Sequence, residues 1–301
     1  MPDSRRPLCA DISGEAGEPP VATASRIDHW LLVEYPGLWS RDVLGGSLLS
    51  ADVKRALREQ LAKLSHSRLL FIRRPERRAA PVRRVYVART LEGGGSLYGL
   101  EIGDYAELAT LDLGAVLAGG VCEPAEHPLF VVCTHGKRDR CCARYGRPVY
   151  EGLREAAPED WVWQSTHVGG DRFAGNVVCL PEGLYFGRVA PADVWILLNS
   201  HLAGRIHLPR YRGSSCHSFP VQAAEHEIRE REGLYDIRGV RVLGYDETAP
   251  DTWTVRLAVG EAVHEVDVRR EWGDLTYLTC EARTLQRPRR FVSSGSRVVV
   301  G

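Results

Sequence analysis

Three cysteines lie within ten residues of one another in the segment Cys133-Thr-His-Gly-Lys-Arg-Asp-Arg-Cys141-Cys142. A short apolar run predicts a strand that ends at Cys133, and a helix is expected to begin near Cys141. In such a strand–loop–helix layout, loop amides and the helix N-terminus face the thiols, which lowers the thiol pKa and favours the metal-binding thiolate. The segment therefore predicts a metal or redox site at one rim of a sheet.

A second loop, at residues 165–173, offers donors of another kind. His167 and Asp171 flank the double glycine Gly169-Gly170. Glycines at this place permit close approach of the backbone to a bulky group. Together the two loops supply two sulfurs, one imidazole and one carboxylate.

Cys141 and Cys142 are adjacent, and neighbouring residues on a helix point about 100° apart. We therefore do not expect both to bind the same metal centre. The spacing of the loop favours Cys141 as the partner of Cys133, which leaves Cys142 packed or present as a spare thiol.

Three kinds of site are compatible with these donors. A zinc site needs four N, S or O ligands at tetrahedral angles. A [2Fe–2S] cluster also takes four protein ligands, and mixed Cys and His ligation is found in Rieske centres. A metal-free redox site would use Cys133 or the pair Cys141–Cys142, although no C-x-x-C motif is present. Composition and spacing alone leave the choice between zinc and iron–sulfur open.

The elements that must hold these loops occur twice in the same order. Hydrophobic periodicity predicts a strand at 29–35, a helix with the apolar stripe Val53, Leu57, Leu61 and Leu64, and strands at 68–73, 84–88 and 97–102. It then predicts a strand at 129–133, a helix at 141–156, strands at 161–165, 176–180 and 184–188, and a helix at 192–202. The repetition favours two thioredoxin-like modules in tandem, of which only the second carries ligands.

The C-terminal part has a different pattern. It predicts a charged helix at 221–232 and antiparallel strands at 240–243, 253–258, 263–268 and 275–278, followed from Arg287 by a loosely held basic tail. The predicted fold class is therefore α/β (α+β). The predicted domains are an irregular N-terminus (1–20), an N-terminal thioredoxin-like module (21–120), a thioredoxin-like domain with the ligands (121–215), and a C-terminal helix with a small antiparallel β module (216–301).

Composition narrows the function classes. Lys and Arg together number 39, as do Asp and Glu, so a net charge of zero argues against a nucleic-acid or membrane surface. The N-terminus lacks a secretory signal and no apolar run could span a bilayer, so a cytoplasmic location and eight reduced thiols are expected. No P-loop, dinucleotide fingerprint or nucleophile elbow is present. Five cysteines are expected to be ordinary core residues: Cys9, Cys122, Cys179, Cys216 and Cys280.

Three longer segments make the sequence recognisable. Phe130–Cys142, His167–Ala174 and Leu180–Arg188 resemble the sucrase/ferredoxin-like family, and the resemblance extends through 204–206, 211–215 and 221–225. It implies a branch of the thioredoxin-like [2Fe–2S] ferredoxins, and the word sucrase implies no activity.

The family's ligands are implied to be two cysteines of the first loop and two histidines of an H-x-G-G-H loop. They carry over to Cys133, Cys141 and His167. Asp171 stands at the second histidine position, so it is the predicted fourth ligand, and Cys142, Cys179 or a water are the alternatives.

The resemblance implies an electron carrier or redox sensor that uses one [2Fe–2S] cluster and an unidentified redox partner protein. Arg138 and Arg172 are expected to neutralise the charge of the cluster, and Gly169 and Gly170 to let the backbone approach it. Two other classes stay open: a zinc-binding structural or interaction protein, and a metal-free thiol-dependent reductase.

Two further features are expected to have ordinary roles. His135 is predicted to face solvent from its loop. A basic run between two strands is predicted to be a solvated hairpin loop, although it could also dock an acidic electron-transfer partner; its members are Arg73, Arg74, Arg77, Arg78, Arg83 and Arg84.

Overall fold

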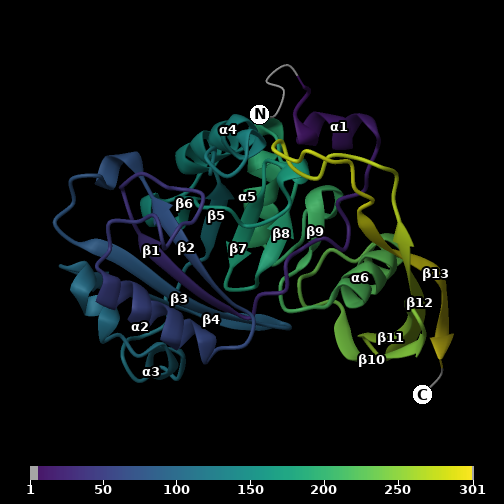
Figure 1. Cartoon of the computed structure of the whole chain (residues 1–301). Helices are drawn as coiled ribbons and strands as arrows, with labels where there is room; N and C mark the ends of the chain where they lie inside the picture. The colour runs from purple at the N-terminus through teal and green to yellow at the C-terminus, as the bar shows by residue number, and fades with distance from the viewer. Residues whose placement is uncertain (1–5, 300–301) are drawn as a thin grey trace.

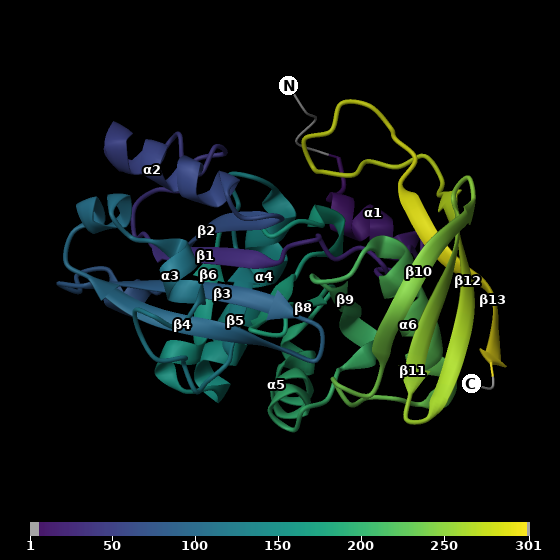
Figure 2. The ribbon, with the colours of Figure 1, turned by 90° about the horizontal axis from the view of Figure 1, so that it is seen from below.

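The structure, a computed structural model, describes residues 6–299 and contains two sheets (Figures 1 and 2). A large curled sheet has nine strands in the order β4-β3-β1-β2-β6-β5-β7-β8-β9, and a separate antiparallel sheet has the order β10-β11-β12-β13. The mixed α/β fold class predicted from the sequence is confirmed. None of the helices within residues 6–299 is long and apolar enough to cross a membrane.

The N-terminal part of the chain builds one half of the large sheet. Its elements are β1 (His29–Glu34), α2 (Ala51–Ala62), β2 (Ser67–Arg73), β3 (Arg83–Leu91), β4 (Gly94–Ile102) and α3 (Leu113–Leu117). β1 pairs in parallel with β2 and antiparallel with β3, and β3 pairs antiparallel with β4. The α2 helix supplies the crossover that a parallel pair of strands requires.

The other half of the sheet repeats these connections. Its elements are β5 (Leu129–Cys133), α4 (Arg140–Ala156), β6 (Val162–Ser165), β7 (Val177–Leu180), β8 (Leu184–Phe186), α5 (Val194–Leu202) and β9 (Tyr211–Ser214). β5 pairs in parallel with β6 and antiparallel with β7, and β7 pairs antiparallel with β8. The order that the sequence repeats is therefore also repeated in the strand connections.

The two halves join where β2 and β6 pair antiparallel, through Ile72 with Ser165 and Arg73 with Gln164. These two strands hold the same place in their respective halves, so the halves are related by an approximate two-fold rotation. Glu34 pairs with Ile72 just as Cys133 pairs with Ser165. Glu34 therefore occupies, in the first half, the position that Cys133 occupies in the second.

The buried carboxylate of Glu34 forms an ion pair with Arg77. Its side chain is 1% exposed, and its Oε1 lies 3.1 Å from Nε of Arg77. Its Oε2 also accepts a hydrogen bond from the backbone N–H of Arg84 at 2.8 Å. A carboxylate held in this way has its hydrogen bonds satisfied by the protein itself.

We expect Arg77→Met to destabilise the protein by about 2–3 kcal/mol, because it leaves the Glu34 carboxylate buried with too little compensating charge. Arg78→Met is the matched control, since Arg78 lies in the same turn and is exposed; it should change stability by less than about 0.5 kcal/mol. Denaturant unfolding of both variants measures the difference. Equal stabilities would contradict this role of the pair.

The basic run is mostly folded against the protein. Besides Arg77, Arg74 is only 3% exposed and lies 3.5 Å from the Asp160 carboxylate. Arg73 stacks over the ring of Trp39 at 3.9 Å. The prediction of a solvated loop is therefore wrong for these three arginines, because acidic and aromatic partners from other elements cover them.

The C-terminal part consists of α6 (Phe219–Glu232), β10 (Arg241–Ala249), β11 (Thr252–Val259), β12 (Ala262–Trp272) and β13 (Arg289–Val299). The basic tail predicted to be loose forms β13, which pairs along β12. Its arginines lie on an edge strand, where charge protects against further pairing. Residues 275–278, predicted as a strand, make only an isolated bridge between Thr276 and Gln286.

The N-terminus also differs from its prediction. Residues 1–20 were expected to be irregular, but they contain the helix α1 (Cys9–Glu15); residues 1–5 lie outside the described part. Short 3-10 helices complete the chain: η1 (Pro75–Arg77), η2 (Tyr105–Ala109), η3 (Glu159–Trp161), η4 (Asp171–Phe173), η5 (Pro191–Asp193) and η6 (Leu208–Arg210).

Candidate metal centre

Two buried sulfurs meet where β5 ends and α4 begins. Cys133 is the last residue of β5 and Cys142 lies in the first turn of α4, and each is 1% exposed. A Cβ atom added at Gly146 would overlap the carbonyl oxygen of Cys133. The absence of a side chain at Gly146 therefore lets α4 lie directly against the end of β5, which brings Cys142 to Cys133. We call Cys133 and Cys142 the sulfur pair.

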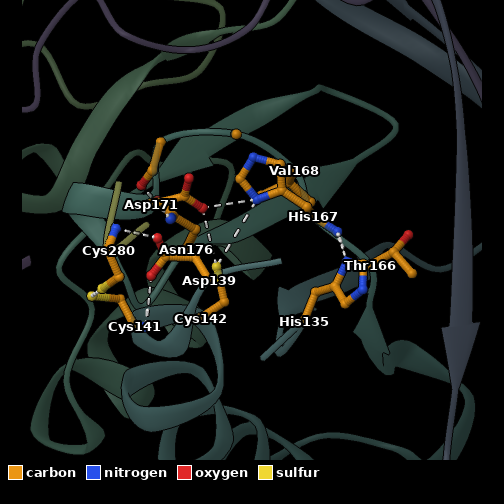
Figure 3. A network of polar contacts seen from close by, with 12 residues as sticks. His135, Asp139, Cys141, Cys142, Thr166, His167, Val168, Asp171, Asn176 and Cys280 are labelled. Carbon is orange, nitrogen blue, oxygen red and sulfur yellow. Dashed lines mark hydrogen bonds and ion pairs between the residues drawn. The ribbon is translucent and has the colours of Figure 1, made fainter. Parts of the chain in front are cut away.

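The loop after β6 supplies a nitrogen and an oxygen to the same place (Figure 3). Nδ1 of His167 lies 3.0 Å from Oδ1 of Asp171, and we call these two the nitrogen–oxygen pair. The Cys142 sulfur lies 3.9 Å from Nδ1 of His167 and 3.4 Å from Oδ1 of Asp171. Donor atoms of Cys133, Cys142 and His167 all lie within 4.8 Å of one another.

Cys141 lies elsewhere. Its sulfur is 3.5 Å from that of Cys9 and 3.2 Å from that of Cys280, in a separate group. The placement of Cys141 beside Cys133, which the sequence favoured, is therefore contradicted by the structure. Cys179, another predicted alternative, is fully buried on β7 in a different part of the core.

The helical phase of α4 explains why Cys142 is the residue beside Cys133. Asp139 caps α4, accepting a hydrogen bond from the backbone N–H of Cys141 at 2.9 Å. From that start, Cys142 falls on the stripe of Gly146, Val149 and Leu153 that faces the sheet. The same apolar stripe is visible in the sequence and could have identified Cys142.

Hydrogen bonds within the site shift the pKa values of Cys133 and His167 in opposite directions. The pKa of the Cys133 thiol is well below its usual value, because hydrogen bonds from Cys142 and His167 stabilise the thiolate against burial. Burial lowers the pKa of His167, but hydrogen bonds to Asp171 and Cys133 outweigh it and raise the pKa to about 9. Because a metal needs neutral imidazole, affinity for metal should increase as pH rises toward about 9.

His135 is buried rather than solvent-facing, which corrects its prediction: it is 1% exposed. Its Nδ1 accepts a hydrogen bond from the backbone N–H of His167 at 3.3 Å. Its ring meets the ring of Trp39 edge to face, with centroids 5.9 Å apart. Trp39 comes from the first half of the chain, so that half of the large sheet helps to cover and fix the site.

The double glycine approaches an arginine that sequence reasoning missed. Gly169 and Gly170 have φ values of +102° and +81°, which disfavour a side chain. Arg212 on β9 is fully buried and donates to the carbonyl of Gly169 at 3.1 Å and to Oδ1 of Asn176 at 2.8 Å. A Cβ added at Gly170 would lie against the Arg212 guanidinium, and one added at Gly169 would meet Oγ of Ser25. The approach of the two glycines to a cluster stays a prediction. The segment 211–215, singled out for the family resemblance, was the available signal.

Arg212 also provides a buried positive charge near the candidate donors. Burial lowers its pKa to about 10, so it remains a cation at neutral pH. Nε of Arg172, the other arginine expected to neutralise a cluster, lies 2.9 Å from the carboxylate of Glu18. Arg138 is half-buried in the turn before α4. Their roles toward a cofactor remain predictions.

We expect Gly170→Ala to destabilise the protein more than Gly204→Ala does. Both glycines have positive φ, but a Cβ at Gly204 meets nothing within 4 Å, whereas at Gly170 it would lie 2.7 Å from Cζ of Arg212. Gly204→Ala should therefore show only the backbone strain of about 1–2 kcal/mol. Thermal and denaturant unfolding compare the two, and equal losses would mean that Arg212 does not constrain the loop.

Comparisons with known proteins agree with the resemblance noted in the sequence. Residues 20–213 match the sequence model of the family described as Sucrase/ferredoxin-like. The chain is 34% identical over 95 residues to Altered inheritance of mitochondria protein 32 of Meyerozyma guilliermondii, covering 28% of this chain and 34% of that protein. The protein of the same name from Saccharomyces cerevisiae is 30% identical over 96 residues, covering 28% of this chain and 31% of that protein. The chain thus matches about a third of the length of these curated relatives.

Among solved structures, the chain is similar to the thioredoxin-like [2Fe–2S] ferredoxin of Aquifex aeolicus. The wild-type crystal structure is 23% identical and covers 29% of this chain and 97% of that chain, with a TM-score of 0.26. A second structure of that ferredoxin, also 23% identical, covers 29% of this chain and 91% of that chain, with the same TM-score of 0.26. Because the family match extends over more than half of the sequence, the chain belongs to the sucrase/ferredoxin-like family.

Proposed function

We propose that this chain binds one [2Fe–2S] cluster through Cys133, Cys142, His167 and Asp171 and acts in electron transfer or redox sensing. The observation that carries the proposal is the sorting of the donors into a sulfur pair and a nitrogen–oxygen pair. A [2Fe–2S] cluster has two irons that each take two protein ligands, and in Rieske centres one iron takes sulfur and the other takes histidine. Membership of a ferredoxin-like family supports the same assignment.

The surrounding residues suit this task. The Cys133 thiolate is stabilised before any metal arrives, and Arg212 contributes a buried positive charge that offsets an anionic ligand set. When bound, the cluster supplies one-electron transfer. Cys133 and Cys142 are each 1% exposed and Asp171 is 5% exposed, whereas the side chain of His167 is 21% exposed. We place the docking of a redox partner protein, and the passage of the electron, on the His167 side.

A single zinc ion is the second candidate, favoured by how compact the site is. Donor atoms of Cys133, Cys142 and His167 lie within 4.8 Å of one another, as the ligands of one ion do. For the two-iron centre, the partly exposed His167 would have to swing outward from the sulfur pair. The two candidates differ in metal, in colour and in sulfide content.

The test is anaerobic purification from iron-replete cells, followed by metal analysis, sulfide analysis and absorption spectroscopy. One cluster requires about two iron and two sulfide per chain and a visible absorption. Colourless protein with zinc bound at Cys133, Cys142 and His167 would reject the cluster in favour of the second candidate. Turnover of thiol substrates by metal-free protein would favour a thiol-dependent reductase.

Asp171 is proposed as the fourth ligand, and its replacement should alter the EPR spectrum of the reduced protein. A carboxylate stabilises oxidised iron more than neutral imidazole does, so Asp171→His should raise the midpoint potential. Asp171→Ala should make the cluster labile or shift its g-values. The competing role is orientation of His167 through the 3.0 Å contact. Unchanged g-values in Asp171→Ala with full iron content would establish that orienting role instead.

A cytoplasmic location and an unidentified redox partner complete the proposal. All eight cysteines are free thiols, which fits a reducing compartment. The name of the curated relatives refers to mitochondria, so fractionation of cells that express a tagged chain should examine both compartments. Recovery of the chain only in mitochondria would contradict the cytoplasmic location.

A further inference from the structure

A second group of thiols lies on the other side of the start of α4, separate from the sulfur pair. It consists of Cys9 at the start of α1, Cys141 in α4, Cys280 in the loop between β12 and β13, and the carboxylate of Asp139, all buried. The sulfur of Cys141 is 3.5 Å from that of Cys9 and 3.2 Å from that of Cys280. The sulfurs of Cys9 and Cys280 are 3.7 Å apart.

The backbone holds these donors in place. The two oxygens of Asp139 accept hydrogen bonds from the backbone N–H groups of Cys141 at 2.9 Å and Cys280 at 2.7 Å. The N–H of Ala10 donates to the Cys141 sulfur at 3.4 Å. Oδ2 of Asp139 is 3.8 Å from the Cys9 sulfur. Three segments distant in the sequence thus present their donors to one point.

We propose that Cys9, Cys141 and Cys280 bind a zinc ion, with Asp139 as the fourth ligand. All four donor atoms lie within 4.8 Å of one another. Tetrahedral zinc with Zn–S bonds of about 2.3 Å holds its sulfurs about 3.8 Å apart. The three sulfur–sulfur distances of 3.2, 3.5 and 3.7 Å need only small outward shifts to reach this value.

The ligand set indicates a structural role for the ion. Four protein donors would leave no open coordination position, which is the mark of a structural zinc site rather than a catalytic one. The three sulfurs are mutually close, so a disulfide between any two would leave the third thiol unpaired beside it. A zinc ion uses all three at once. The guanidinium of Arg6 binds the carbonyl oxygens of Cys280 and Ala282, and places a positive charge next to the anionic ligands.

The ion would link α1 and the segment between β12 and β13 to α4, the helix that also carries Cys142. Cys9 and Cys280 are 271 residues apart in the sequence, and Figures 1 and 2 show the segment between β12 and β13 passing beside α1. The α1 helix is further held by a hydrogen bond from Tyr145 of α4 to Asp11. Glu18, which follows α1, pairs with Arg172 next to Asp171. The zinc site would therefore fix the segments that pack against the nitrogen–oxygen pair.

The test measures zinc and iron in the same anaerobic preparations, made without chelators from medium that contains both metals. Wild-type protein should hold about one zinc per chain, and Cys9→Ser and Cys280→Ser should each fall below about 0.1 zinc per chain. Cys133→Ser should keep the zinc, as should the control Cys122→Ser, because Cys122 belongs to neither group. Zinc retained in both Cys9→Ser and Cys280→Ser would overturn the proposal, as would wild-type protein without zinc.

A measurement on wild-type protein covers the case in which these variants do not fold. Zinc K-edge X-ray absorption should show three sulfur ligands and one oxygen. Two sulfurs with nitrogen would place the zinc at Cys133, Cys142 and His167 and overturn the proposal. A disulfide among Cys9, Cys141 and Cys280 in freshly isolated protein would overturn it too. Iron content is scored separately, so failure of the cluster assignment and failure of the zinc assignment give different results.

Discussion

Cys142→Ser is expected to remove the visible absorption and at least about nine-tenths of the iron, whereas Cys141→Ser is expected to keep both. The reason is the helical phase of α4, which turns Cys142 toward Cys133 and His167 and turns Cys141 toward Cys9 and Cys280. The two variants change adjacent residues in the same turn of one helix, so each is a close control for the other. Iron analysis and absorption spectra of anaerobic preparations measure the effect.

The zinc content of the same two variants should show the opposite pattern. Cys141→Ser should lose zinc and keep iron, while Cys142→Ser should lose iron and keep zinc. Loss of iron in Cys141→Ser, with a normal spectrum in Cys142→Ser, would contradict the arrangement of the two groups. That outcome would restore the register that the spacing of the sequence favoured.

His167→Cys is expected to lower the midpoint potential by on the order of 100 mV or more, because replacing imidazole by an anionic thiolate disfavours the added electron. If His167 of the wild-type protein binds iron through one ring nitrogen, reduction would make the other ring nitrogen hold its proton more tightly. The potential should therefore fall as pH rises through the window between the oxidised and reduced pKa values, by up to about 59 mV per pH unit. His167→Cys should abolish this slope.

Redox titrations of wild-type protein and His167→Cys across pH, with iron content checked at each end, measure both effects. The partial exposure of His167 lets its ring exchange a proton with solvent. A wild-type potential that stays flat from mildly acidic to strongly alkaline pH, with the cluster intact, would contradict histidine ligation. A potential unchanged in His167→Cys would do the same.

The sequence predicted the architecture of the large sheet well, because local periodicity records which face of each element is buried. The repeated β-α-β-β-β order is present in both halves, and the loops that hold Cys133 and His167 were correctly expected at strand ends. The prediction that Cys141 is the partner of Cys133 was wrong by one residue, because the adjacent Cys142 holds that position. The stripe of Gly146, Val149 and Leu153 indicates Cys142, whereas the spacing of the loop favours Cys141.

Other features could not be predicted because they depend on contacts between distant segments. Cys9 and Cys280 were expected to be ordinary core residues, and nothing in their neighbourhoods signals that they meet Cys141 across 132 and 139 residues of chain. Arg212 contacts the double glycine from a strand that follows it by more than forty residues. His135 was expected to face solvent. Its burial could not be predicted locally, because Trp39, which covers it, comes from the first half of the chain.

In the proposed [2Fe–2S] cluster, the sulfur pair holds one iron and the nitrogen–oxygen pair holds the other. Mössbauer spectroscopy of protein grown with ⁵⁷Fe can examine this assignment, because the signal of each iron depends on its own ligands. We expect two doublets of equal area in the oxidised protein, one typical of iron bound only by sulfur and one of iron bound also by nitrogen and oxygen. On reduction, only the second iron should become ferrous. A single doublet, with both irons in the same all-sulfur environment, would contradict ligation by His167 and Asp171.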